Sequence, residues 1–546
     1  MSNILARRVS ANSLVLAVSF LLASTANIQF WSVFIDAVGG VSPARLPLLL
    51  GSFTIVVLLF HGLLTLVSFR FVVKPALILV LLSAATAAWF INEYGIVIDK
   101  AMIQNIFETD PREAVELLSW KLVLFVALTG GLPSLLVAGA RIRFPAGAHG
   151  VAQRAGTAGA SLALGALLLV LLFKSLAPTV REHRELRYLL TPTNVVQGLN
   201  GYLRNRWGRP VPLVMIGRDA VKGERWTGQT RRTVTLIVVG ETARAANFSL
   251  NGYMRDTNPQ LKRQEGLINF AKVQSCGTAT AVSVPCVFSV LGRDQYDEAR
   301  AGHQEGLLDI LSHADFDVLW HDNNSGCKGV CDRVAFTDLS SPATGNLHCA
   351  GDECYDEGLL DKLPELIRHA SKDLVIVLHQ KGSHGPAYAQ RYPAGFGRFG
   401  PVCTTGAFDQ CSRKSIVAAY DNTILYTDYF LSKTIDLLRT TAKDESVDTA
   451  MLYFSDHGES LGEANMYLHG APYMFAPDAQ THVPMMLWMS DGFTERFRID
   501  RACLGARRDQ QLSHDNVFHS VLGMLDIETA VRNPQLDIFH ACVRHD

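Results

Sequence analysis

Three apolar runs in the second half of the sequence each end in residues that can bind a metal ion or transfer a proton. The runs are residues 233–239, 374–378 and 449–454. The polar residues that follow them are Glu241, His384, Asp456 and His457. In a sheet of parallel strands, ligands gather at the carboxyl ends of the strands. We therefore expect these four side chains to meet at one site.

Glu241, Asp456 and His457 offer two carboxylates and an imidazole, which suit a zinc ion. Thr280 could supply a fourth ligand, because zinc lowers the pKa of a bound hydroxyl and holds it as a nucleophile. The surrounding sequence also favours a phosphate site. Thr280 precedes a plausible helix, whose first N–H groups can face an anion. An isolated threonine is normally a capping or surface residue, so the argument depends on this context.

The loop at residues 275–286 reads Ser-Cys-Gly-Thr-Ala-Thr-Ala-Val-Ser-Val-Pro-Cys. It carries two threonines, Thr278 and Thr280, between two cysteines. The small residues around them leave room for a tetrahedral group to approach. Residue chemistry alone does not decide which of the two hydroxyls reacts.

The elements that must position these residues alternate between buried strands and helices. Helical patterns at residues 307–313, 356–369 and 414–440 separate the apolar runs. This alternation predicts an α/β fold for the second half of the chain.

The first third of the chain predicts five membrane-spanning helices, at residues 13–37, 46–68, 75–96, 119–140 and 156–176. The first run follows Arg7 and Arg8 and contains Ser-Thr-Ala at 24–26, as a cleaved signal peptide would. Its length and the four further runs favour an uncleaved anchor.

Loop charges predict the orientation of these helices. Basic residues are concentrated before the first run, between the second and third, and between the fourth and fifth, which places these segments in the cytoplasm. An odd number of spans then puts everything after about residue 177 on the other side. We expect a multi-pass protein of the bacterial inner membrane with its second half in the periplasm.

All ten cysteines lie at or after Cys276, in neighbouring pairs along the chain. An even count in such pairs is typical of disulfides formed in an oxidising compartment. The alternatives are reduced thiols or cysteine-rich zinc sites. Export of this half, inferred independently from loop charges, favours the disulfides.

Two further segments complete the predicted organisation. Asn105, Thr109 and Glu113 recur at every fourth position, and Thr109-Asp110-Pro111 looks like a helix start, so we expect two short helices there. Spacing alone favours a solvated interfacial loop. The predicted domains are a transmembrane domain (1–176), a linker with an amphipathic helix at about 190–204 (177–232) and a soluble catalytic domain (233–546).

The overall charge excludes one class of partner. The 546 residues include 50 Lys and Arg and 51 Asp and Glu, for a net charge of −1. Proteins that bind nucleic acid usually present a strong basic excess. We therefore expect a membrane protein without a nucleic-acid partner.

Five motifs together resemble the lipid A phosphoethanolamine transferases, members of the alkaline phosphatase/sulfatase superfamily that include the mobile colistin-resistance enzymes. They are Gly-Glu-Thr-Ala-Arg from residue 240 (with Asn-Gly-Tyr from 251), the 275–286 loop, Lys-Gly-Ser-His-Gly-Pro from 381, Ser-Asp-His-Gly-Glu-Ser-Leu-Gly-Glu from 455 and Tyr-Leu-His-Gly from 467. The resemblance covers essentially the whole chain. The Ser-Asp-His-Gly-Glu motif alone indicates only the superfamily.

The resemblance implies a role for each candidate residue. Glu241, Thr280, Asp456 and His457 would hold the catalytic zinc, and Thr280 rather than Thr278 would be the nucleophile. His384 and His469 match histidines near the transferred phosphate, where they would bind a second zinc or protonate a leaving group.

Two further sets of residues gain their interpretation only from the resemblance. The residues that would contact phosphoethanolamine are Asn105, Thr109, Glu113, Ser325 and Lys328. The implied disulfides are Cys276–Cys286, Cys327–Cys331, Cys349–Cys354, Cys403–Cys411 and Cys503–Cys542.

The implied reaction moves phosphoethanolamine from phosphatidylethanolamine to a phosphate of lipid A through a threonine intermediate, and we expect a monomeric enzyme. The lower surface charge that follows would promote polymyxin and colistin resistance. Alternatives are another acceptor, such as a core heptose or a glycan, and a phosphoglycerol transferase or hydrolase of the superfamily. A sensor or scaffold with a structural metal is disfavoured, because structural zinc usually has a closed shell of Cys and His.

Overall fold

The computed structural model describes residues 8–108, 111–144, 147–183, 185–206 and 212–544. The chain forms two compact units. The membrane unit comprises residues 1–103 and 118–206, and the catalytic unit comprises residues 104–117 and 207–546. The segment 104–117 thus belongs to the catalytic unit although membrane helices flank it in sequence. Residues 177–232, taken as a linker from the sequence, are divided between the two units.

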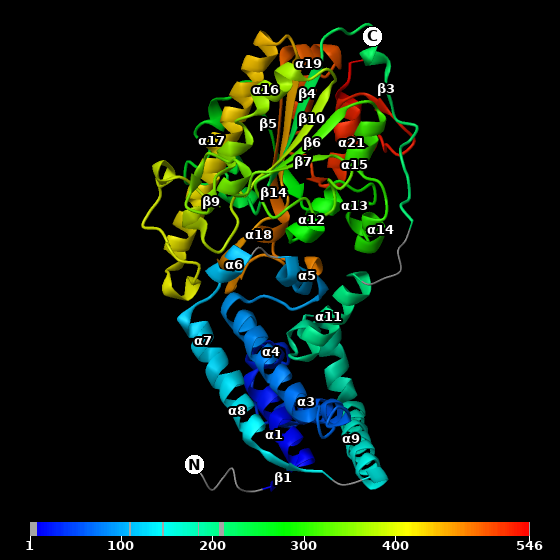
Figure 1. Cartoon of the computed structure of the whole chain (residues 1–546), viewed down its shortest axis with the longest axis vertical. Helices are drawn as coiled ribbons and strands as arrows, with labels where there is room; N and C mark the ends of the chain where they lie inside the picture. Colours follow the sequence, from blue (N-terminus) through cyan, green and yellow to red (C-terminus); the bar gives the residue numbers. More distant parts are fainter. Residues whose placement is uncertain (1–7, 109–110, 145–146, 184, 207–211, 545–546) are drawn as a thin grey trace. The chain divides into compact units, whose positions relative to one another are not determined.

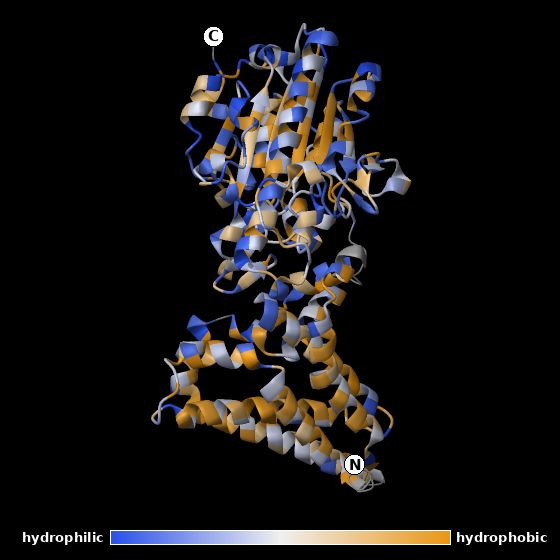
Figure 2. Ribbon diagram, turned by 90° about the vertical axis from the view of Figure 1, so that its left-hand side faces the viewer, coloured by the Kyte–Doolittle hydropathy of each residue, from blue (hydrophilic) through white to orange (hydrophobic). Residues whose placement is uncertain are grey.

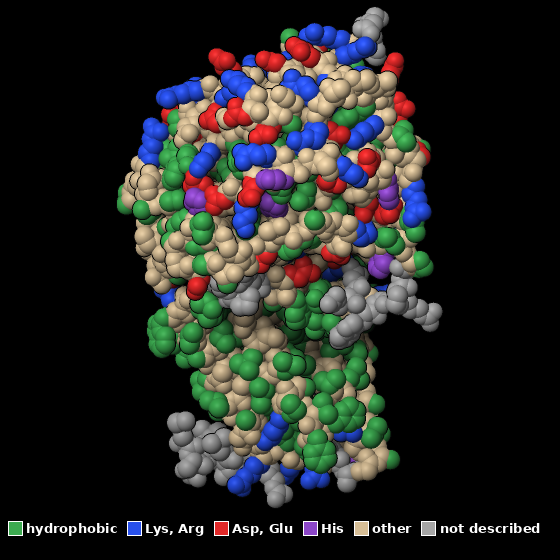
Figure 3. Space-filling model, turned by 45° about the horizontal axis from the view of Figure 1, so that its top comes forward, with side chains coloured by type: hydrophobic (Ala, Val, Ile, Leu, Met, Phe, Trp, Pro, Cys, Tyr) green, Lys and Arg blue, Asp and Glu red, His purple; other side chains and the backbone are tan. Residues whose placement is uncertain are grey.

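The membrane unit contains the apolar helices that the sequence predicts. Four described helical segments are long and apolar enough to span a bilayer: α3 (Leu46–Leu66), α4 (Val73–Tyr94), a segment from Trp120 to Gly139 and α9 (Gly147–Glu182). The third comprises α7 (Trp120–Val126), the π-helical turn η1 (Ala127–Gly131) and α8 (Leu132–Gly139). Figure 2 shows that these helices are the most hydrophobic in the chain, and Figure 3 shows exposed apolar side chains gathered on them.

The first predicted span is not one straight helix. It consists of α1 (Ala11–Thr25) and α2 (Ile28–Ala37), which meet at 61° and make a fifth span if counted together. Asn27 lies at the break, where its buried side chain donates to Leu22 O at 2.8 Å and to Thr191 O at 2.7 Å. This side chain takes up a carbonyl near the end of α1, which favours the bend.

The short connecting helices agree with the sequence. Residues 100–116 form α5 (Lys100–Glu108) and α6 (Pro111–Glu116), with Pro111 at the first helical position as expected. The amphipathic helix appears as α11 (Thr193–Arg206). Thr109 lies outside the described residues, and so does the side chain of Glu113.

The catalytic unit is built on an eight-stranded sheet in the order β15-β5-β14-β11-β4-β10-β6-β7. The central strands β4 (Thr233–Gly240), β10 (Leu374–His379) and β11 (Asp448–Ser455) are parallel and buried along their whole length. β6 (Asp317–Asp322) and β7 (Ala335–Asp338) continue the parallel part. The predicted α/β fold is confirmed, with the expected strands at its centre.

The other half of the sheet contains a reversal that the sequence analysis did not anticipate. β14 (His482–Met489) runs antiparallel to both β11 and β5 (Ile268–Gln274). β15 (Leu512–Ser513) pairs parallel to β5 at the edge. Two reversals restore the original direction, so β5 ends at the same edge of the sheet as β4 and β11.

Helices cover both faces of this sheet (Figure 1). α16 (Leu363–His369) and α17 (Arg413–Asp444) lie on one side, and α15 (Leu307–His313) and α21 (Asp515–Met524) on the other. Alternate residues of the central strands pack with α15 and α21 in one buried apolar cluster. Both faces of the central strands are buried by apolar side chains, so the acidic and histidine side chains of these segments lie at the strand ends.

Candidate active site

The structure brings Glu241, Asp456 and His457 together because β4 and β11 are parallel neighbours. Their last residues, Gly240 and Ser455, are paired in register, and the Asp456 amide donates to Gly240 O at 2.8 Å. The residues that follow them, Glu241 and Asp456, therefore lie next to each other. All three site side chains are fully buried, and their ligand atoms lie within 4.8 Å of one another.

The tautomer of His457 determines what these three side chains can bind. Its Nδ1 lies 2.9 Å from Gly458 O, which can only accept, so the proton is on Nδ1 and Nε2 carries a lone pair. That Nε2 lies 3.4 Å from Glu241 Oε1 and 3.4 Å from Asp456 Oδ2. Electron pairs thus converge from three side chains, an arrangement that could hold a metal ion.

The electrostatics of the cluster lead to the same conclusion. Burial, and then the neighbouring Glu241 carboxylate, raise the pKa of Asp456 well above its ordinary value. Burial, and then His469, lower the pKa of His457 to about 4, so the imidazole is neutral. Within the described residues, Asp456 Oδ2 accepts no hydrogen bond. The donor set therefore fits a divalent metal ion that binds oxygen and nitrogen.

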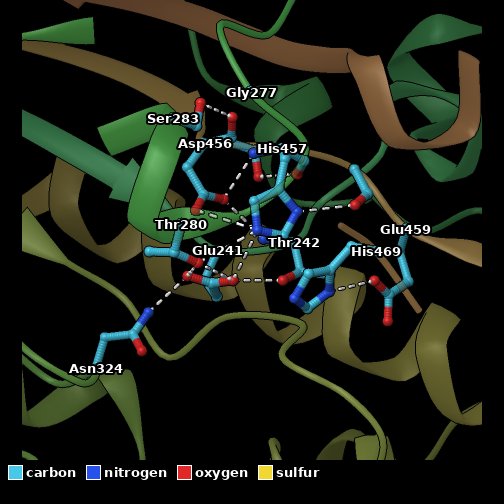
Figure 4. Close-up of polar contacts among 12 residues, drawn as sticks. Glu241, Thr242, Gly277, Thr280, Ser283, Asn324, Asp456, His457, Glu459 and His469 are labelled. Atoms are coloured by element: carbon cyan, nitrogen blue, oxygen red, sulfur yellow. Dashed lines mark hydrogen bonds and ion pairs between the residues drawn. The ribbon is translucent and has the colours of Figure 1, made fainter. Parts of the chain in front are cut away.

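Thr280 completes this cluster. It is the first residue of α12 (Thr280–Val287), which follows the loop after β5. Its Oγ1 lies 3.1 and 3.2 Å from the Glu241 carboxylate oxygens and 3.3 Å from His457 Nε2. Figure 4 shows the hydroxyl directed at the carboxylate. The structure thus places one hydroxyl among the potential metal ligands.

Thr278, the other threonine of the loop, is directed elsewhere. Its Oγ1 donates to Ala471 O at 2.6 Å, and its carbonyl accepts from the Gly470 amide at 2.7 Å. Both bonds fix the chain next to His469. The geometry therefore favours Thr280 over Thr278 as the candidate nucleophile, because only the Thr280 hydroxyl faces Glu241 and His457.

Contacts that the sequence analysis did not identify hold the nucleophile loop in place. Ser283 Oγ donates to Asp456 O at 2.5 Å, and the Cys276 amide donates to His514 Nδ1 at 3.0 Å. Cys276 and Cys286 form a disulfide across the same loop. Because Ser283 and His514 act through partners about 170 and 240 residues away, no local pattern could reveal them.

His469 and His384 line the site beside this cluster. The His469 ring centroid lies 4.4 Å from that of His457 and 5.8 Å from that of His384. His469 Nδ1 lies 2.9 Å from Glu459 Oε2 (Figure 4). Tyr388 donates to the other Glu459 oxygen. A carboxylate on Nδ1 orients the ring and leaves Nε2 to act on a substrate.

Asn324 is a further contact of the candidate metal-binding residues. Its Nδ2 donates to Glu241 Oε2 at 2.7 Å (Figure 4). The same nitrogen donates to Gln380 O at 3.0 Å. Ser325 follows it in the chain, and Lys328 Nζ donates to Ser325 Oγ at 3.0 Å. The structure thus brings Ser325 and Lys328 together on the loop that leaves β6.

The remaining predicted residues have these positions. Asn105 lies on α5, within the part of the chain assigned to the catalytic unit. The structure contains five disulfides, with the pairing that the family resemblance implies. Within the described residues there is no free cysteine.

Comparison with known proteins identifies the same family over both units. A sulfatase family model matches residues 233–527, and a model described as phosphoethanolamine transferase EptA/EptB matches residues 56–207. The phosphoethanolamine transferase EptA of Escherichia coli K12 is 40% identical over 546 residues, which cover 99% of each chain. The phosphatidylethanolamine transferase Mcr-1 of Escherichia coli is 39% identical over 539 residues, covering 95% of this chain and 96% of Mcr-1.

A solved structure agrees with these sequence matches. The integral membrane lipooligosaccharide phosphoethanolamine transferase A (EptA) of Neisseria meningitidis superimposes with a TM-score of 0.93 at 34% identity, covering 99% of this chain and 100% of that one. The agreement extends over membrane and catalytic regions together. The chain therefore belongs to the phosphoethanolamine transferase family, with a catalytic domain of the sulfatase type.

Proposed function

We propose that this enzyme transfers phosphoethanolamine from phosphatidylethanolamine to a phosphate of lipid A, through a covalent phosphoethanolamine–Thr280 intermediate at a zinc site. The observation that carries the proposal is the position of the Thr280 hydroxyl, 3.1 Å from Glu241 and 3.3 Å from His457. Family membership supports the donor and the acceptor.

In the first step the Thr280 hydroxyl releases its proton to solvent, and its oxygen forms a bond to the phosphorus of phosphatidylethanolamine. The bond from phosphorus to the diacylglycerol oxygen breaks, and the leaving oxygen takes up a proton from His384 or His469. The product is phosphoethanolamine esterified to Thr280.

Glu241, Asp456 and His457 would hold the zinc ion with Thr280. When bound there, zinc lowers the pKa of the threonine hydroxyl and stabilises negative charge on the phosphoryl oxygens. A second zinc beside His384 and His469 is an alternative to proton transfer by these residues.

In the second step an oxygen of the lipid A phosphate forms a bond to phosphorus, and the bond to Thr280 breaks. The membrane helices keep the enzyme beside two lipid substrates, with the catalytic unit in the periplasm and the helices in the inner membrane. Phosphoethanolamine would be held by Asn105, Thr109, Glu113, Ser325 and Lys328, and a monomer contains all these residues.

The covalent step is tested with Thr280→Ala and, as a matched control, Thr278→Val. We expect mass spectrometry of protein incubated with phosphatidylethanolamine to find a phosphoethanolamine adduct on wild type and on Thr278→Val. Thr280→Ala should carry none and release diacylglycerol at least about a thousandfold more slowly. An adduct of normal yield on Thr280→Ala would contradict the assignment.

The acceptor is tested by mass spectrometry of lipid A from cells with and without this gene. We expect a phosphoethanolamine-sized addition to lipid A, and higher inhibitory concentrations of polymyxin, because the added ammonium offsets phosphate charge. An unmodified lipid A with a modified core would indicate a core heptose acceptor instead.

A further inference from the structure

The segment 104–117 is attached to the catalytic unit through Glu116, at the end of α6. Both carboxylate oxygens of Glu116 accept from Arg391 Nη2, at 2.9 and 2.6 Å. The side chain of Arg391 is 1% exposed and that of Glu116 is 15% exposed. This ion pair joins residues 275 positions apart in sequence.

Arg391 uses its other donors on two different parts of the catalytic unit. Nη1 donates to Glu353 Oε1 at 2.8 Å, and Nε donates to the backbone carbonyl of His384 at 2.9 Å. The planar guanidinium thus contacts the 104–117 segment and the backbone of His384 at the same time. A buried arginine with three acceptors around its fork has a fixed orientation.

A second contact connects the same regions without any charge. A Cβ placed on Gly406 would lie 2.5 Å from Glu116 O and 3.0 Å from Cγ of Pro386. Gly406 therefore allows the end of α6 to approach the chain closely, next to the residues that follow His384. The Glu116–Arg391 ion pair and the close approach at Gly406 therefore show independently that the end of α6 packs next to the chain around His384.

We propose that Arg391 is a positioning residue that makes the placement of His384 depend on the docking of segment 104–117. When α6 is docked, Glu116 fixes the guanidinium and Nε fixes the His384 backbone. When α6 is displaced, a buried guanidinium loses one of its two carboxylates and reorients toward Glu353. This inference rests on the proposed function of His384 and of Asn105, Thr109 and Glu113, and it links headgroup binding to the reacting phosphate.

The test compares Glu116→Gln and Gly406→Ala in the full-length enzyme in phosphatidylethanolamine nanodiscs. One variant removes the charge and the other adds a methyl group at the close approach. We expect both to increase hydrogen exchange in peptides covering 104–117. Both should also lower kcat for diacylglycerol release by about tenfold, with unchanged zinc content. A loss confined to KM would show that docking does not reach His384 and would overturn the proposal.

Two control variants separate this coupling from general destabilisation. Gly395→Ala lies in a neighbouring exposed turn, where a Cβ meets no atom within 4 Å, and should behave as wild type. Glu353→Gln removes the other carboxylate of Arg391 but should leave exchange in 104–117 unchanged. Wild-type exchange in both Glu116→Gln and Gly406→Ala would also overturn the proposal. If wild-type enzyme released no diacylglycerol, the proposed function would fail, while the exchange data would still report on docking.

Discussion

A buried aspartate begins strand β11 and another follows its last residue, and the two have opposite surroundings. Asp448, at its start, pairs with Arg496 at 3.0 Å and Arg231 at 3.2 Å. Asp456 follows its end beside the Glu241 carboxylate, and within the described part of the chain it forms no ion pair with lysine or arginine. Burying a carboxylate without a cation costs several kcal/mol.

The difference separates the end of the strand where the aspartate stabilises the fold from the end where the aspartate belongs to the candidate active site. At the start of β11 the protein supplies the positive charge itself. At the other end it supplies two carboxylates and an imidazole lone pair, which could hold a metal ion, and the Thr280 hydroxyl beside them. A charge imbalance of this kind indicates a metal site even where distances alone would be ambiguous.

Among the substitutions that test this difference between the two aspartates, Asp456→Asn should have the largest effect. Asn keeps the Oδ1 that accepts from the Thr242 and His457 amides, but replaces the anionic Oδ2 of the cluster. We expect loss of bound zinc and at least a hundredfold lower kcat/KM, measured by elemental analysis and diacylglycerol release. Asp448→Asn is the control, since it should lower thermal stability but retain zinc. Full zinc occupancy in Asp456→Asn would refute the metal assignment.

Glu459 is an intermediate case, because its partner is a histidine rather than an arginine or a metal. Glu459→Gln keeps an acceptor for His469 Nδ1 but removes the negative charge that orients and polarises the ring. We expect kcat to fall by about tenfold with zinc retained. Glu463→Gln, in the same hairpin but paired with Arg244, should change kcat less than twofold. Equal losses in the two variants would argue against a role for the pair.

The smallest effect is a change in thermal stability on metal removal. On the proposed function, zinc bound by Glu241 and Asp456 would bind only the folded protein, so a chelator should lower the Tm of wild type by about 5 °C or more. Readdition of zinc should restore it. Asp456→Asn should show little change under the same treatment, as followed by differential scanning fluorimetry. A wild-type Tm insensitive to the chelator would show that the carboxylates are neutralised in another way.

The meeting of Glu241 and Asp456, two candidate metal ligands, could be predicted from sequence because the fold forces it. Glu241 and Asp456 each follow a long apolar run, and parallel neighbours place such positions side by side. The membrane helices were equally predictable, since a bilayer demands long apolar segments. In the sheet the constraint is the pairing of buried parallel strands, and in the membrane helices it is the thickness of the bilayer; each leaves its mark on a short stretch of sequence.

The parts that sequence could not supply depend on distant partners. β5 carries Asn269, Lys272 and Gln274, so its mixed character concealed a strand that positions the nucleophile loop. The roles of Glu459 and Asn324 come from single hydrogen bonds to His469 and Glu241. Such contacts leave no periodic pattern. Residue chemistry alone left Thr278 and Thr280 open, and the choice of Thr280 came from the family resemblance; the structure adds the direction of each hydroxyl.

The attachment of α6 to Arg391 also has a consequence for biosynthesis. At translation rates of about 5–20 residues per second, the partner of Glu116 emerges roughly 15–55 s after Glu116 itself. The catalytic unit is therefore discontinuous in the order of synthesis, and its first segment must wait for the rest. A nascent chain arrested before residue 391 contains that segment without its arginine, so completion of the catalytic unit is a late event in the maturation of this enzyme.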